Sequence, residues 1–190
     1  MLTDKDYIEI AKRNGINDYK LLKTVVKVET GGKTFITTGK PYILFEGHVF
    51  WKQLQYKKIN PAKYVKYNEN ILYKKYDKSK YKGGLAEYNR LNQAIKINED
   101  AAYNSISSGI FQIMGFNHLK CGYPTAKGMF LSMCKSEINQ LQIGAYFIYK
   151  RGLTKYLNVH NWSKFAYYYN GPAYKTNNYD VKLEKYYKSL

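Results

Sequence analysis

Glu29 lies in a stretch whose residue types and spacing favour acid–base chemistry. Leu22, Val26 and Glu29 recur at i, i+4 and i+7, so on a helix the carboxylate continues an otherwise apolar stripe. Gly31 and Gly32 follow and indicate the end of that helix. Apolar neighbours disfavour the charged form of a carboxyl group, so one interpretation is a general acid that stays protonated near neutral pH. The other is an ordinary helix-end acid that pairs with a nearby lysine.

Gln112 is a polar residue inside an apolar run, Ile110-Phe111-Gln112-Ile113-Met114. A glutamine amide that is buried without hydrogen-bond partners costs about 1–3 kcal/mol. The Gln112 amide is therefore expected either to form hydrogen bonds within the core or to bind a ligand.

Capping residues and breakers predict the helices that must position these groups. Thr3 caps a helix over residues 4–13, and Asn17 or Asp18 caps the helix that delivers Glu29. Further helices are expected over residues 48–54, 85–97, 99–103, 125–134, 136–150, 161–170 and 174–187. Two of these carry apolar stripes, Leu85/Tyr88/Leu91/Ile95 and Ile138/Leu141/Ala145/Ile148, which we expect to be buried.

Residues 34–45 are rich in β-branched and aromatic types around Gly39-Lys40-Pro41, which predicts a short β-hairpin. The hairpin places Glu46 at a strand end and returns the chain toward Glu29. Residues 56–82, dominated by lysine, tyrosine and asparagine, are expected to form a long surface excursion and not a second domain.

The composition indicates one domain that spans residues 1–190, because 190 residues with 45% hydrophobic content can bury one good core. No apolar run approaches the ~20 residues of a membrane span, and the first residues lack the pattern of a secretory signal. Cys121 and Cys134 are expected to be reduced thiols. The histidines are scattered, so neither a metal site nor a cofactor is expected.

The formal charge of +17, from 31 basic and 14 acidic residues, predicts attraction to polyanions such as nucleic acid, anionic lipid or an anionic cell envelope. Only Arg13, Arg90 and Arg151 are arginines. Lysine, tyrosine, asparagine and isoleucine all have A/T-rich codons, so genome composition is the competing explanation of this bias.

Three blocks occur in order along the chain: residues 29–32 (ETGG), 108–114 (SGIFQIM) and 166–172 (AYYYNGP). Together they resemble the signature blocks of the goose-type lysozyme and lytic transglycosylase superfamily. Each block is weak alone, and the order of the three makes the resemblance specific.

A closer resemblance, to the N-acetylmuramidase family of phage endolysins and modular peptidoglycan hydrolases, covers nearly the whole chain. The similar segments are residues 28–32, 39–41, 43–46, 48–51 and 107–117, with Glu87-Tyr88, Arg90-Leu91, Ser136-Glu137, Gln140-Leu141, residues 169–172, Tyr174, Tyr179-Asp180 and Leu183. The chain departs from the family pattern at Ser108, Gly47 and Thr30, where the family usually has tryptophan, a basic residue and serine.

The resemblance implies a mainly α (α+β), lysozyme-like fold, a helical domain with a small β-hairpin. It also implies cleavage of the β-1,4 bond between N-acetylmuramic acid and N-acetylglucosamine in peptidoglycan, with Glu29 as the general acid. Gln112 and Asn170 are expected to hold N-acetyl groups, and Tyr169 and Tyr174 to offer faces and hydroxyls to sugar rings. Plain core packing is the alternative for the tyrosines and for Gln112.

Glu46 is the first candidate for a second catalytic carboxylate, and a structural acid that bonds backbone donors or His48 is the alternative. Glu137 and Asp180 are less favoured, since each is explained as a helix-terminus or packing acid. A lytic transglycosylase, which forms 1,6-anhydro-muramyl products, needs no second carboxylate. A non-catalytic phage structural or polyanion-binding protein is the remaining alternative.

The expected partners are peptidoglycan and the anionic envelope, with no specific nucleic acid and no membrane span, and a monomer is expected. The protein is expected to be made in a bacterial host cytoplasm without a signal peptide. It would then reach the wall through a holin-type pore or from a phage particle.

Overall fold

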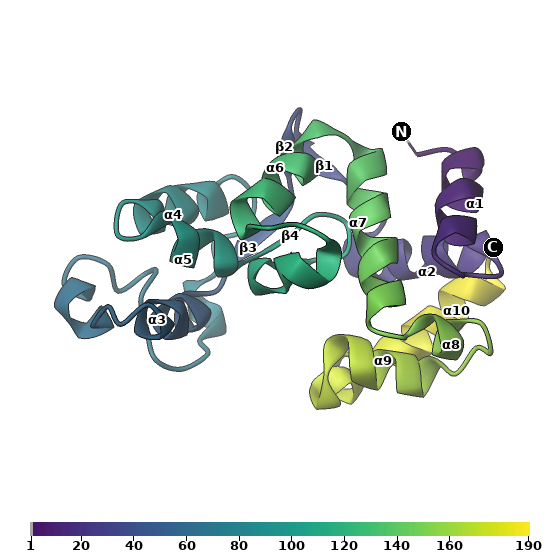
Figure 1. Cartoon of the computed structure of the whole chain (residues 1–190). Coiled ribbons are helices and arrows are strands. Elements are labelled where there is room, and N and C mark those ends of the chain that lie inside the picture. Colours follow the sequence, from purple (N-terminus) through teal and green to yellow (C-terminus); the bar gives the residue numbers. More distant parts are fainter. Residues whose placement is uncertain (1) are drawn as a thin grey trace. The chain divides into compact units, whose positions relative to one another are not determined.

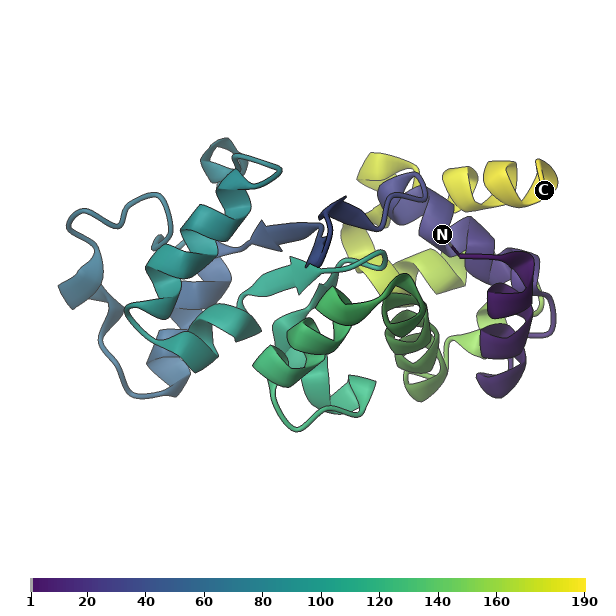
Figure 2. The same cartoon turned by 90° about the horizontal axis from the view of Figure 1, so that it is seen from above.

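The computed structural model describes residues 2–190 and divides them into two compact units. The terminal unit comprises residues 2–34 and 136–190, and the central unit comprises Phe35–Lys135. Helices predominate in both, with two small antiparallel sheets in the central unit (Figure 1). Both ends of the described chain belong to the terminal unit (Figure 2). No helix among the described residues is both long and apolar enough to cross a bilayer.

The terminal unit consists of helices that begin at local capping residues. These are α1 (Asp4–Arg13), α2 (Tyr19–Thr30), α7 (Glu137–Lys150), α8 (Thr154–Leu157), α9 (Trp162–Asn170), the 3₁₀-helix η4 (Pro172–Asn177) and α10 (Tyr179–Lys188). Side chains of Thr3, Asp18, Ser136 and Asn161 accept backbone N–H groups at the starts of α1, α2, α7 and α9. These four predicted caps are confirmed, and Asp18 caps α2.

The core of the terminal unit forms where α2 packs against α1 and α10 and where α10 packs against α9. Leu21, Leu22, Val25 and Val26 of α2 are buried there, as are Phe165 and Leu183. The predicted buried stripe of α7 is confirmed at Leu141, Ala145 and Ile148 but is wrong at Ile138, which is 49% exposed. Ile138 lies in the first turn of α7, where the helix has not yet entered the core.

The predicted helix over residues 174–187 is wrong in its first part. Residues 172–177 form η4, and Asn178 adopts φ +49° before α10 begins at Tyr179. Asparagine tolerates this left-handed conformation better than most residues, so it breaks one expected helix into two. The break makes Tyr179 the first residue of α10, which packs against α2.

The central unit contains β1 (Phe35–Thr37), β2 (Lys40–Pro41), β3 (Ile43–Phe45), α3 (Gly47–Tyr56), η1 (Pro61–Tyr64), η2 (Lys78–Lys80), α4 (Ala86–Ile95), α5 (Glu99–Asn104), β4 (Ile106–Ser108), β5 (Ile113–Met114), η3 (Gly115–Cys121) and α6 (Ala126–Lys135). β1 and β2 form the predicted hairpin, but it is shorter than expected. β3 instead pairs with β4, which pairs with β5 in a second sheet, as Figure 2 shows. Glu46 lies at the end of β3, as predicted.

Residues 56–82 are not purely a surface excursion. Ile71 and Leu72 within them are almost completely buried, and they pack into the same cluster as Phe45, Phe50 and Leu54. Burying one side chain of this size stabilises a fold by about 1.5–3 kcal/mol. Two adjacent apolar residues therefore fasten the polar segment to the central unit.

The predicted apolar stripe of α4 is confirmed at Leu91, which is buried, and at Tyr88 and Ile95, which are partly buried against the core, but it is wrong at Leu85. Leu85 is 45% exposed, whereas Glu87 and Arg90 are buried and lie 2.7 Å apart, Oε2 to Nη1. Glu87 accepts the backbone N–H groups of Phe45, Lys82 and Gly83. Arg90 donates to the carbonyl oxygen of Phe45. This charged pair therefore joins α4 to the end of β3 beside the apolar contacts of Leu91.

Candidate functional site

Glu29 lies in the last turn of α2, which Gly31 ends in the left-handed conformation with φ +64°. Its side chain remains partly exposed to solvent. The hydroxyl group of Tyr179, the first residue of α10, donates a hydrogen bond to Oε1 of Glu29. Burial raises the pKa of Glu29 to about 7, and the Tyr179 hydrogen bond opposes that rise. The carboxyl group is thus substantially protonated near neutral pH.

Tyr179 is buried, with only 5% of its surface exposed. Burial, followed by the negative field of Glu29, raises its pKa well above the usual value, so the phenol keeps its proton and acts only as a donor. The ring of Tyr169 stacks on that of Tyr179 with centroids 6.1 Å apart. The ring of Phe165 also stacks on that of Tyr169, with centroids 5.1 Å apart. An aromatic stack therefore holds the hydroxyl that contacts Glu29.

The other predicted residues of the terminal unit lie at the end of α9 and in η4. Asn170, the last residue of α9, is exposed, and Tyr169 is partly exposed. Tyr174 is 7% exposed, and its ring meets the exposed Tyr167 edge-on at 6.5 Å. Asn170 and Tyr169 can thus be reached from solvent, whereas Tyr174 mainly packs. Sugar binding by all three stays a prediction.

Glu46 lies in the central unit, between β3 and α3. Its Oε2 atom accepts a hydrogen bond of 2.6 Å from the Tyr81 hydroxyl and lies 3.3 Å from Nδ1 of His48. Burial lowers the pKa of His48 despite the attraction of Glu46, so the imidazole is neutral at pH 7 and the contact is no full ion pair. The backbone N–H of Glu46 donates to the Ser105 carbonyl oxygen at 2.9 Å. Both the main chain and the carboxylate are held in place.

Gln112 lies in the turn between β4 and β5, with φ +45°. Its Oε1 accepts from the Ser107 hydroxyl at 3.0 Å, and its Nε2 donates to the carbonyl oxygens of Gly109 at 2.8 Å and Tyr42 at 3.3 Å. The amide is therefore satisfied within the central unit, where it ties the turn to the residue before β3. Its second predicted role, reading a ligand, stays a prediction.

The predicted site residues divide between the two units. Glu29, Tyr169, Asn170 and Tyr174 belong to the terminal unit, while Glu46 and Gln112 belong to the central unit. The approach of Glu46 to Glu29 stays a prediction. Glu137, a less favoured acid, accepts the Thr34 hydroxyl at 2.5 Å in the terminal unit, where it serves as a packing acid.

Sequence reasoning missed Tyr179 as a partner of Glu29 and missed the Glu87–Arg90 pair. Both occur in the segments that resemble the muramidase family, so the resemblance was the signal that could have found them. Periodicity could not, since Tyr179 contacts a residue 150 positions away.

The described residues offer little support for metal binding or for a cysteine nucleophile. No group of three or more His, Cys, Asp or Glu residues in the described part of the chain could hold a metal ion. Cys121 and Cys134 are free thiols, and burial raises their pKa values to about 12 and about 11. Such thiols carry almost no thiolate at neutral pH and are poor nucleophiles.

Comparison with known proteins gives a matching family model and similar solved structures. A family model described as N-acetylmuramidase matches residues 18–190, from the cap of α2 onward. The chain is similar to the crystal structure of the Burkholderia AP3 phage endolysin, with 36% sequence identity and a TM-score of 0.86 over 99% of this chain and 70% of that one. A comparison with curated proteins finds no match. The similarity to the endolysin confirms the predicted lysozyme-like, mainly α fold.

Proposed function

Because the chain belongs to the N-acetylmuramidase family of peptidoglycan hydrolases, we propose that it cleaves the β-1,4 bond between N-acetylmuramic acid and N-acetylglucosamine, with Glu29 as the general acid. The observation that carries this assignment is the carboxyl group of Glu29 at the end of α2, whose pKa burial raises to about 7. Cleavage of a glycosidic bond requires an acid that is still protonated when the leaving oxygen departs.

Tyr179 supports the same assignment. As Glu29 gives its proton to the leaving oxygen, its carboxyl group becomes a carboxylate, and a hydrogen bond from a neutral donor then strengthens. The Tyr179 hydroxyl is such a donor, already in contact with Oε1 of Glu29. We therefore assign Tyr179 the role of stabilising the charge that develops on Glu29 during proton transfer.

Glu46 is the proposed second carboxylate. In an inverting hydrolase it would activate water from about 6.5–9.5 Å, and in a retaining one it would attack the sugar from about 5–5.5 Å. The hydrogen bond from Tyr81 and the His48 ring beside it support an oriented side chain of Glu46. Its alternative role is structural, because the same contacts stabilise the start of α3.

The proposed substrate contacts are made by the predicted binding residues, each described within its own unit. The exposed amide of Asn170 would bond an N-acetyl group, and Tyr169 would offer a partly exposed ring and hydroxyl to a sugar. Gln112, which is partly exposed, would also bond the N-acetyl group, and Tyr174, which is 7% exposed, would offer its ring to a sugar.

A lytic transglycosylase is the second candidate reaction. Two hydrogen bonds support it. Glu29 accepts one from the uncharged phenol of Tyr179, and the Glu46 side chain already accepts one from the Tyr81 hydroxyl. A reaction in which the sugar's own hydroxyl closes a 1,6-anhydro ring requires only the first of these carboxylates. A non-catalytic polyanion-binding protein, the third candidate, draws only on the +17 charge.

Product analysis of purified peptidoglycan tests the proposal. With the wild-type protein we expect new reducing ends at N-acetylmuramic acid, detected by mass spectrometry. Glu29→Gln should reduce the rate by about 10²–10⁴-fold, the usual contribution of a general acid. The matched control is Glu9→Gln, since Glu9 is an exposed glutamate on α1 that pairs only with Arg13.

Other results of the same experiment would change the assigned reaction or the assigned acid. Anhydro-muramyl ends would replace hydrolysis by the transglycosylase reaction. Unchanged lysis by Glu29→Gln would remove the enzymatic assignment of this residue. Reducing ends at N-acetylglucosamine would show that the other glycosidic bond is cut.

The proposed partner is peptidoglycan in an anionic envelope, to which the +17 charge attracts the protein. We propose that the protein reaches the wall through a holin-type pore or from a phage particle, and that it acts as a monomer.

A further inference from the structure

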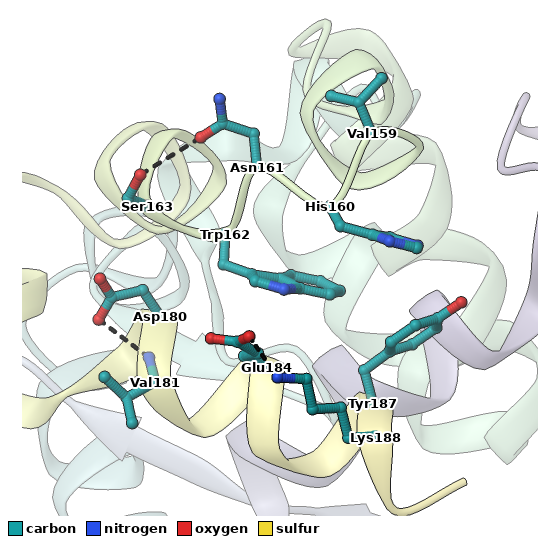
Figure 3. Close-up of a pocket in the computed structure, with 10 residues that line it drawn as sticks. All are labelled: Val159, His160, Asn161, Trp162, Ser163, Asp180, Val181, Glu184, Tyr187 and Lys188. Atoms are coloured by element: carbon teal, nitrogen blue, oxygen red, sulfur yellow. Dashed lines mark hydrogen bonds and ion pairs between the residues drawn. The ribbon is translucent and has the colours of Figure 1, made fainter.

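A cavity of about 630 Å³ opens on the terminal unit between the segment that leads into α9 and the outer side of α10 (Figure 3). Its walls come from residues 159–163 and from Asp180, Val181, Glu184, Tyr187 and Lys188. None of the residues assigned above to catalysis or substrate binding lines it. Its volume is in the range of small-ligand sites, which is about 300–1,000 Å³.

Three rings form one wall of the cavity. His160 stacks on Trp162 with centroids 5.4 Å apart and an angle of 7° between the planes, as Figure 3 shows. Tyr187 lies 4.6 Å from His160 and 5.5 Å from Trp162. The Tyr187 hydroxyl donates to Asp18 at 2.8 Å, which fixes its ring. The wall is therefore rigid and does not need to be ordered when a ligand binds.

His160 is held in an unfavourable backbone conformation, with φ +53°. A non-glycine residue there costs about 1–3 kcal/mol and persists only where its surroundings impose it. The His160 N–H donates to Leu157 at 2.9 Å, and the Trp162 N–H donates to the His160 carbonyl at 2.9 Å. This conformation places the imidazole on the indole. A glycine would make the turn without strain, so the ring itself is the feature that needs an explanation.

The rest of the cavity is amphipathic. Val159 and Val181 are 70% and 60% exposed and present apolar surface. Asp180 accepts the Val181 N–H at 3.0 Å through Oδ1, and Oδ2 has further acceptor capacity. Glu184 pairs with Lys188 at 2.7 Å, which brings a donor and an acceptor side by side and balances their charges.

We propose that this cavity is a second saccharide-binding site, which takes a neutral N-acetylated sugar unit. A sugar presents apolar faces to rings and methyl groups while its hydroxyls both donate and accept, which matches the three features of the walls. Lys188 already neutralises Glu184, which weakens the case for a cationic ligand. Asp180, which has no such partner lysine in the cavity wall, disfavours an anionic one. The identity of the sugar as part of a peptidoglycan strand rests on the proposed function, whereas saccharide binding itself does not.

The test is an NMR titration of the full-length Glu29→Gln protein, in which cleavage is suppressed, with N,N′,N″-triacetylchitotriose. We expect the indole N–H signal of Trp162 and the methyl signals of Val181 to shift in a saturable way. His160→Asn, which tolerates positive φ but lacks the ring, should weaken this response by about tenfold. Tyr149→Ala is the matched control, since Tyr149 is 50% exposed on α7 and lies outside the cavity.

The outcomes separate this proposal from the proposed function. If the sugar perturbs only signals around Glu29 and Tyr179, the second site is refuted while the muramidase assignment stands. If Trp162 responds but the wild-type protein releases no fragments from peptidoglycan, the site stands and the assignment falls. If N-acetyl-lysine methylamide shifts the Trp162 signal and the sugar does not, the cavity binds cations and the saccharide proposal is overturned.

Discussion

At the scale of single residues, the contact between Tyr179 and Glu29 sets the pH at which the proposed acid works. Burial raises the pKa of Glu29 to about 7, and the Tyr179 hydrogen bond lowers it. Removing that bond with Tyr179→Phe should therefore raise the pKa further and move the alkaline limb of the pH–rate profile to higher pH. The maximal rate should fall about tenfold, because the carboxylate formed on proton transfer loses its donor.

The pH dependence of peptidoglycan solubilisation, measured for both proteins, checks this expectation. Tyr19→Phe is the control, since Tyr19 lies on the same helix α2 as Glu29 but its hydroxyl bonds the exposed Asp4 of α1 and not Glu29. A profile that moves to lower pH in Tyr179→Phe would contradict the conclusion that the Tyr179 hydrogen bond lowers the pKa of Glu29.

At the scale of elements, Asp18 couples the two helices that carry this contact. Oδ1 of Asp18 accepts the Lys20 N–H at the start of α2, and Oδ2 accepts the Tyr187 hydroxyl of α10. Losing an N-cap costs about 0.5–2 kcal/mol and losing a typical hydrogen bond about 0.5–1.5 kcal/mol. Asp18→Ala should therefore lower the free energy of unfolding in urea by about 1–3 kcal/mol.

Asp18→Asn provides the comparison for that measurement. Asparagine caps helices as well as aspartate does and still accepts a hydrogen bond from Tyr187, so most of the stability should return. Equal losses in both variants would show that the charge of Asp18, and not its hydrogen-bond geometry, stabilises these helices.

At the scale of the whole molecule, the formal charge of +17 should make the enzyme depend on ionic strength. Salt shortens the reach of surface charges to about 8 Å at physiological ionic strength, so activity on whole cell walls should fall as salt rises. Turnover of a soluble neutral chitooligosaccharide is the control and should change little. If the activity on cell walls does not change from low to moderate salt, attraction between the protein's charge and the envelope does not contribute to it.

Whether the two compact units unfold together is a second prediction for the whole molecule. We expect them to form a single catalytic domain over residues 1–190, because only four residues separate α2 from β1 and only one separates α6 from α7, so both connections are short. Calorimetry should then show one unfolding transition whose calorimetric and van't Hoff enthalpies agree. Two separate transitions would make each unit a domain of its own.

The sequence by itself determined the helices and the position of Glu29 within one of them. Thr3, Asp18, Ser136 and Asn161 start helices where local capping predicts them, because a cap bonds backbone groups only two or three residues away. Gly31 ends α2 for an equally local reason. These interactions are nearly complete within short windows of sequence.

Only the tertiary structure decided which distant groups meet. β3 pairs with β4, more than sixty residues later, instead of extending the hairpin of β1 and β2. Glu87 and Arg90 share the buried face of α4 with Leu91 because together they satisfy the main chain of Phe45, which apolar side chains could not do. Tyr179 reaches Glu29 because Asn178 breaks a helix and α10 packs on α2. Such contacts depend on how whole elements pack, and no local pattern of residues encodes that packing.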